Sequence, residues 1–167
     1  MRQGLIERLV PPLIDLHAAR WTARDRYELR SDARRFVNWE SNVAGKLGIG
    51  VAVDYVLALG LDAIRARITK QAAQLRSRLC EIPGLCVHDL GRVKGGIVTF
   101  TVEALAAEDV AQALKSRSIN VVTSSVFSTL YNMEARGLSK MVRASVHYLT
   151  TDEEIDLLVL PVADMQA

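Results

Sequence analysis

The chain has 167 residues, enough for one domain with a hydrophobic core or for a domain with an additional segment. Half of the residues are hydrophobic and 24% are charged, as in ordinary α/β or α+β proteins, and the net charge of +2 predicts no affinity for nucleic acids. There is no run of about 18 apolar residues and no uninterrupted apolar segment at the N-terminus, so we expect a cytoplasmic protein.

The first 40 residues are predicted to form an arm rather than a domain. Residues 4–10 favour a short helix, and Pro11 with Pro12 would end it because proline cannot continue a helix. A brief apolar run over residues 13–16 is predicted to be extended.

Residues 17–35 show no regular hydrophobic period and combine Trp21 and Tyr27 with many arginines. Aromatic side chains among arginines could stack on single-stranded nucleic acid. However, the first 35 residues contain five acidic residues beside eight arginines, which argues against such a role.

Residues 41–59 are predicted to form a helix that Gly60 ends. Gly45, Gly48 and Gly50 lie within it, but their order does not match the dinucleotide-binding fingerprint and no strand precedes them. Because a helical glycine costs up to about 1 kcal/mol relative to alanine, three of them indicate close packing against another helix.

A second long helix is predicted from residue 61 to the Pro83-Gly84 pair. Its apolar residues recur at steps of three and four, which is typical of a helix face packed on a core. These residues are Leu61, Ile64, Ile68, Ala72, Leu75, Leu79 and Ile82.

The period then changes to two. Residues 85–90 and 97–102 are predicted to form paired strands, and residues 108–117 a short amphipathic helix. Residues 119–123 are predicted to be a strand, and a polar, serine-rich loop is expected to follow it as far as Gly137.

The stretch 141–156 combines a strand with a helix start. Val142, Ala144 and Val146 alternate with outward residues, among them Arg143. Thr151 and Glu154 form a capping box, so a terminal helix should begin there. An arginine in this position could anchor a carboxylate, because its planar guanidinium donates two parallel hydrogen bonds.

Together these elements predict an α+β fold, with two long helices followed by a mainly antiparallel sheet that has helices on one face. We expect two parts, residues 1–40 and residues 41–167.

Few other residues suggest chemistry. Cys80 and Cys86 match no metal-binding pattern and are predicted to act as small apolar residues. His17, His88 and His147 share no motif and are predicted to be surface or strand-packing residues. We assign no catalytic, coenzyme-binding or metal-binding residue.

The chain nevertheless resembles class V aminotransferases, the fold-type I pyridoxal-phosphate enzymes that include cysteine desulfurases and isopenicillin N epimerase-like proteins. The resemblance is carried by residues 142–156, which read VRASVHYLTTDEEID, by residues 33–67 as the linker helix, and by VKGGIVTFTVE at 93–103. It implies that residues 1–40 are an N-terminal arm that crosses a large domain, and that residues 41–167 are linker helices with a C-terminal small domain. It also implies that Arg143 binds the substrate carboxylate.

Two departures from the family bear on the reaction. The loop that carries the desulfurase cysteine reads TSSVFSTLYNMEARG here, so a persulfide-forming desulfurase is not expected. Where the family often has Gly-Thr this chain has Trp39 and Glu40, which leaves Glu40 as a candidate substrate contact instead of a phosphate donor.

The resemblance also implies pyridoxal phosphate, which needs a Schiff-base lysine. None of the five lysines matches that motif, so we expect the coenzyme not to be bound by this chain alone. The expected protein is a truncated C-terminal domain, inactive alone, that forms a homodimer or assembles with a separately encoded large domain. The alternative is a non-catalytic module that binds a small anion, such as an amino-acid-like carboxylate, or another protein.

Overall fold

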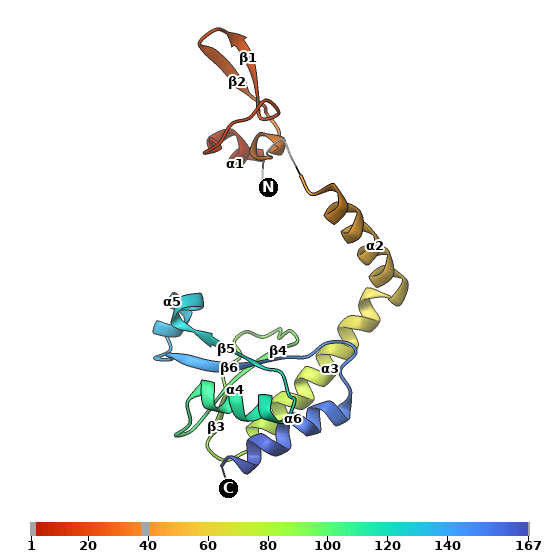
Figure 1. Cartoon of the computed structure of the whole chain (residues 1–167), viewed down its shortest axis with the longest axis vertical. Coiled ribbons are helices and arrows are strands. Elements are labelled where there is room, and N and C mark those ends of the chain that lie inside the picture. The colour runs from red at the N-terminus through yellow and green to blue at the C-terminus, as the bar shows by residue number, and fades with distance from the viewer. Residues whose placement is uncertain (1–2, 38–40, 167) are drawn as a thin grey trace. The chain divides into compact units, whose positions relative to one another are not determined.

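The computed structural model describes residues 3–37 and 41–166 (Figure 1). The chain divides into two compact units, Met1–Tyr55 and Val56–Ala167. The boundary predicted between residues 40 and 41 falls at the edge of the undescribed stretch and stays a prediction. Each unit is described by itself.

The first unit contains a β-hairpin in the stretch where the sequence shows no regular hydrophobic period. Before α2, it comprises α1 (Gln3–Arg8), β1 (Ala19–Ala23), β2 (Arg26–Leu29) and the 3-10 helix η1 (Ala33–Phe36). Trp21 lies opposite Tyr27 in the antiparallel pair, and their rings meet edge to face with centroids 6.5 Å apart. Most residues of both strands are exposed. The strands therefore lack the alternation of apolar and polar residues from which a half-buried strand is predicted.

Polar side chains shape the rest of this unit. Asp15 Oδ1 accepts hydrogen bonds from the backbone N–H groups of His17 (2.8 Å) and Ala18 (3.0 Å), which makes a turn. The prediction of an extended run over residues 13–16 is therefore wrong, because this turn begins within it. Arg35 is buried and donates a 2.8 Å hydrogen bond to the carbonyl oxygen of Ile6, which ties η1 to α1.

The two predicted long helices are present as α2 (Val43–Leu59) and α3 (Leu61–Cys80). Gly60 separates them with a φ of 89°, in the left-handed region that glycine tolerates. No residue of α2 is buried, and a Cβ placed at Gly48 or Gly50 would meet no atom within 4 Å. The close helix contact predicted from the glycines is thus absent within the described chain.

The membrane question concerns the same two helices. Among the described residues, no single helix is both long and apolar enough to cross a membrane. Helices α2 and α3 meet the criteria of length and composition only when they are taken together, and the pair is bent by 77°.

The second unit is a four-stranded antiparallel sheet with helices on one face, which confirms the predicted α+β fold (Figure 1). The strand order is β3-β4-β6-β5. The strands are β3 (Leu85–Val87), β4 (Ile97–Val102), β5 (Val122–Ser125) and β6 (Lys140–Ser145), and the helices added to α3 are α4 (Ala107–Ser116), α5 (Val126–Glu134) and α6 (Asp152–Asp164).

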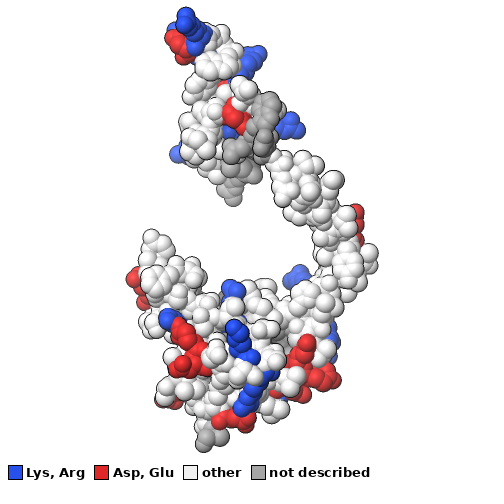
Figure 2. Space-filling model, viewed as in Figure 1, with Lys and Arg blue, Asp and Glu red and all other residues white. Residues whose placement is uncertain are grey.

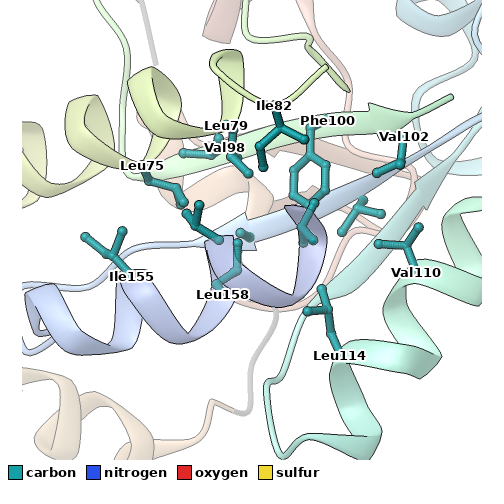
Figure 3. Close-up of a cluster of buried hydrophobic side chains, with 14 of the residues drawn as sticks. Leu75, Leu79, Ile82, Val98, Phe100, Val102, Val110, Leu114, Ile155 and Leu158 are labelled. Atoms are coloured by element: carbon teal, nitrogen blue, oxygen red, sulfur yellow. The ribbon is translucent and has the colours of Figure 1, made fainter. Parts of the chain in front are cut away.

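The core lies between this sheet and helices α3, α4 and α6. Figure 3 shows Phe100 of β4 among leucines that come from all three helices. The predicted face of α3 is buried from Ala72 onward, whereas Leu61 at its start is exposed. Burying one such side chain is worth about 1.5–3 kcal/mol, so this cluster is the main source of the unit's stability.

One predicted loop is a helix. The prediction for the segment after β5 is wrong, because residues 126–134 form α5, which is kinked at Thr129. Phe127 and Tyr131 are 96% and 88% exposed, and Met133 is the one buried residue of this helix. Ser128 and Thr129 favoured a loop prediction, because such side chains compete with the helix for backbone hydrogen bonds.

Candidate functional site

Arg143 projects from the face of the sheet that the helices leave uncovered. It lies on β6, one of the two central strands, with Thr99 of β4 opposite it on one side and Val122 of β5 on the other. Its neighbours Val142 and Ala144 are buried in the core, so the strand's alternation turns Arg143 outward. The sequence predicted this orientation correctly.

The Arg143 guanidinium is available to a ligand. Arg143 is exposed, and its guanidinium makes no hydrogen bond or ion pair with any other residue that the structure describes. A free guanidinium can bind a carboxylate with two parallel hydrogen bonds, which is the chemistry that the sequence suggested. The role itself stays a prediction.

Beside Arg143 the open face carries a polar network that the sequence did not reveal. Asp89 accepts hydrogen bonds from the Thr99 N–H (2.9 Å) and hydroxyl (2.7 Å). It also forms a 2.6 Å ion pair with Arg76 of α3, whose side chain is 12% exposed against 9% for Asp89. Arg76 in turn donates to the carbonyl oxygens of Gly95 (2.7 Å) and Ile97 (2.8 Å).

His88 extends this network along the edge strand. Its Nε2 lies 2.8 Å from the Thr101 hydroxyl oxygen, and its carbonyl oxygen accepts a 2.5 Å hydrogen bond from Arg136. Burial and the positive charge of Arg136 lower the pKa of His88 below its usual value, although Asp89 acts in the opposite direction. His88 is therefore held towards its neutral form.

A cavity of about 260 Å³ opens between these residues. Arg76, Lys94 and Arg136 line it together with His88 and Asp89. Thr99, the residue opposite Arg143, lines it too. The residues around the cavity thus carry three cations against one carboxylate, which favours anionic groups on this face.

Other predicted residues are scattered. Glu40, the second candidate substrate contact, lies outside the described residues, and its role stays a prediction. The interpretation of Cys80 and Cys86 as apolar packing residues is wrong, because both are exposed. Within residues 3–37 and 41–166, no group of three or more His, Cys, Asp or Glu side chains is placed to hold a metal ion.

The described residues do not by themselves fit the pyridoxal phosphate that the resemblance implies. All five lysines are exposed, and Lys46 and Lys140 are already bound to Ser41 and Glu108. Only Lys94 borders the cavity, and the carboxylate there, Asp89, is committed to Arg76 and Thr99. An enclosed lysine beside a free carboxylate is what the coenzyme needs.

Comparisons with known proteins agree with the fold and the sequence pattern. The family model for aminotransferase class-V matches residues 2–158. A cysteine desulfurase of Dickeya dadantii is 34% identical over 126 residues, which cover 75% of this chain and 30% of the relative. A probable cysteine desulfurase of Methanothermobacter thermautotrophicus is 30% identical over 140 residues, or 81% of this chain and 35% of the relative.

Solved structures give the same result. The apo structure of a cysteine desulfurase from Thermococcus onnurineus superposes with a TM-score of 0.85 and 25% identity. This match covers 99% of the present chain and 42% of the other. The chain thus spans about a third of the length of its curated relatives and less than half of this structure. With a family match over nearly its whole length, it belongs to the aminotransferase class-V family.

Proposed function

We propose that this chain supplies the linker helices and small domain of a class V aminotransferase-like enzyme, in which Arg143 receives the carboxylate of an amino-acid substrate. The observation that carries the proposal is the free guanidinium of Arg143 on the open face of a central strand. A bidentate hydrogen bond from such an arginine fixes both the position and the orientation of a carboxylate.

The coenzyme-binding residues are proposed to lie outside these 167 residues. Two observations support this view: the lysines of the chain are exposed, and the chain covers 21–35% of the length of curated relatives. In this account the chain contributes substrate binding and is inactive alone. Pyridoxal phosphate, held by residues outside these 167, would supply the electron sink.

The parent reaction is proposed to be other than persulfide formation, although the relatives cited above are named cysteine desulfurases. That reaction needs a thiolate that attacks sulfur, and the segment from β5 through α5 contains no cysteine. Transamination, epimerisation or elimination of an amino acid fits the residues equally well.

A partner is proposed to cover the exposed apolar residues of the chain. No residue of α2 is buried, and its visible face carries little charge (Figure 2). In the first unit Leu9, Leu13 and Trp21 are exposed, and Ile6 is buried. A helix that is apolar all round is normally buried, so we propose a large domain on a separate chain or a second copy of this one.

Calorimetry with amino acids and 2-oxo acids tests the role of Arg143. Wild type is compared with Arg143→Ala and with Arg92→Ala, a control that removes another exposed arginine of the same unit. Binding that is lost in Arg143→Ala and kept in Arg92→Ala supports the anchor, and binding that survives Arg143→Ala contradicts it. The absence of binding to wild type would contradict a stand-alone anion-binding module, the second candidate function.

A separate experiment tests the missing lysine. The isolated chain is incubated with pyridoxal phosphate, reduced with borohydride and digested for mass spectrometry. We expect no stoichiometric adduct on any single lysine, because none is enclosed. A stoichiometric adduct on one defined lysine would contradict the proposal that the coenzyme site lies elsewhere.

A further inference from the structure

Cys86 and His88 lie two residues apart on the uncovered face of the edge strand β3 and its extension. The Cys86 sulfur is exposed and 3.9 Å from His88 Nδ1. Because β3 pairs only with β4, nothing in the described sheet covers the outer side of this strand. The thiol is therefore open to reagents from solvent.

Thr101 holds the histidine in a useful orientation. It is the cross-strand partner of Cys86, and its hydroxyl oxygen lies 2.8 Å from His88 Nε2. When Nε2–H donates to this hydroxyl, Nδ1 keeps its lone pair and faces the sulfur. Cys86, His88 and Thr101 thus form a nucleophile, a base and a group that orients the base.

The charges around the pair favour an anionic reagent. His88 is faced by Arg136, in the turn after α5, and borders the cavity that Arg76 of α3 and Lys94 also line. Asp89 is the carboxylate among them, and it is paired with Arg76. The remaining positive charge attracts negatively charged reactants.

We propose that Cys86 is a reactive thiol, assisted by His88, that exchanges with small disulfides carrying negative charge. The Cys86 S–H proton passes to His88 Nδ1 while the sulfur attacks one sulfur of the disulfide. A new S–S bond forms, the old one breaks, and the leaving thiolate takes up the proton from His88. The step consumes one disulfide and needs no other oxidant. It is independent of the carboxylate role of Arg143.

The chain contains its own control, because Cys80 is also exposed and forms no hydrogen bond or ion pair with the described residues. Cys80→Ser leaves Cys86 as the single thiol, and Cys86→Ser leaves Cys80. Each protein is treated with dithiobis-nitrobenzoate, which carries two carboxylates, and with neutral dipyridyl disulfide. We expect Cys86 to react at least about tenfold faster than Cys80 at neutral pH, given the usual effect of a general base.

The base is tested in the Cys80→Ser background. His88→Gln should lower the Cys86 rate to about that of Cys80, and Thr101→Val should lower it by a smaller factor. The Cys86 rate should fall where His88 protonates, and burial and Arg136 lower the pKa at which this happens, whereas the Cys80 rate should show no such step. Thr101→Val, in which His88 is no longer held by the hydroxyl, should bring the pH profile of Cys86 closer to that of Cys80.

Three results would overturn the proposal. Equal rates for Cys86 and Cys80 would show that the site does not activate the thiol. An unchanged Cys86 rate in His88→Gln would show that the histidine is not the base. The control for this variant is the His88→Gln, Cys86→Ser protein, in which unaltered Cys80 kinetics would confirm that the fold is intact. An equal advantage of Cys86 over Cys80 with the anionic and the neutral disulfide would remove the preference for negative charge.

Discussion

Arg143 lies directly opposite Thr99 across the β4–β6 ladder, and the Thr99 hydroxyl donates a 2.7 Å hydrogen bond to Asp89. Asp89 is paired with Arg76, so the strand beside the proposed carboxylate anchor is linked to helix α3. The open face at this point is therefore held by a nearly buried ion pair rather than by apolar packing alone. This arrangement limits the freedom of the backbone that carries Arg143.

Removing Asp89 should destabilise the second unit strongly. Asp89→Ala leaves Arg76 with an unpaired charge and the Thr99 N–H without its acceptor, which should cost about 3 kcal/mol. Asp156→Ala breaks an ion pair with Arg78 in which Asp156 is 53% exposed, and it should cost no more than about 1 kcal/mol. Urea denaturation measures both, and equal losses would contradict the structural role given to Asp89.

Two adjacent leucines of α6 should differ in their effects. Leu158 is 8% exposed and belongs to the core, whereas Leu157 is 60% exposed. Leu158→Ala should lower the free energy of unfolding by about 2–5 kcal/mol, and Leu157→Ala by about 0.5 kcal/mol or less. A larger effect at Leu157, seen by denaturation of the isolated chain, would mean that this face of α6 is covered in solution.

The capping box at the start of α6 should contribute measurably. The Thr151 hydroxyl accepts a hydrogen bond from the Glu154 N–H, and the Glu154 carboxylate accepts one from the Thr151 N–H. Thr151→Ala should cost about 1 kcal/mol. Thr69→Ala, at an exposed position within α3, should be neutral or slightly stabilising. Thermal unfolding of the two variants separates them, and indistinguishable midpoints would rule out a contribution from the cap.

Acidification should destabilise the protein partly through His88. Because the folded state lowers the pKa of His88, the unfolded chain binds its proton more readily. This contribution to stability is fully present above the ordinary histidine pKa of about 6.5 and is lost as the pH falls through the lowered value. Wild type should therefore lose more stability than His88→Gln between about pH 7.5 and pH 5.5, a range above most carboxylate titration. Parallel losses in the two proteins would contradict the shift.

The successes of the sequence-based predictions share a physical cause. The outward orientation of Arg143 and the α6 cap were predicted because the alternation around β6 and the Thr151–Glu154 spacing are local signals. The face of α3 was predicted in the same way, since its apolar residues recur at helical spacing where the helix meets the sheet.

The failures have a common cause too. The strands of the β1–β2 hairpin bury almost nothing and so lack the alternation that a prediction needs, and the short α5 contains Ser128 and Thr129, which favour a loop. The link between Arg76 and Asp89 joins a helix to the end of a strand 13 residues later, and no local pattern indicates it. The exposure of Cys86 likewise follows from the position of β3 at the edge of the sheet, which strand order alone decides.

The most direct test of the carboxylate anchor is to observe the Arg143 side chain itself. NMR spectra of the arginine Nε–H groups are recorded while an α-amino acid is added, with Arg143→Lys used to assign the Arg143 signal. We expect that signal to shift progressively and to saturate, while the signal of the control residue Arg92 stays in place. A saturating shift at other arginines with no change at Arg143 would contradict the account.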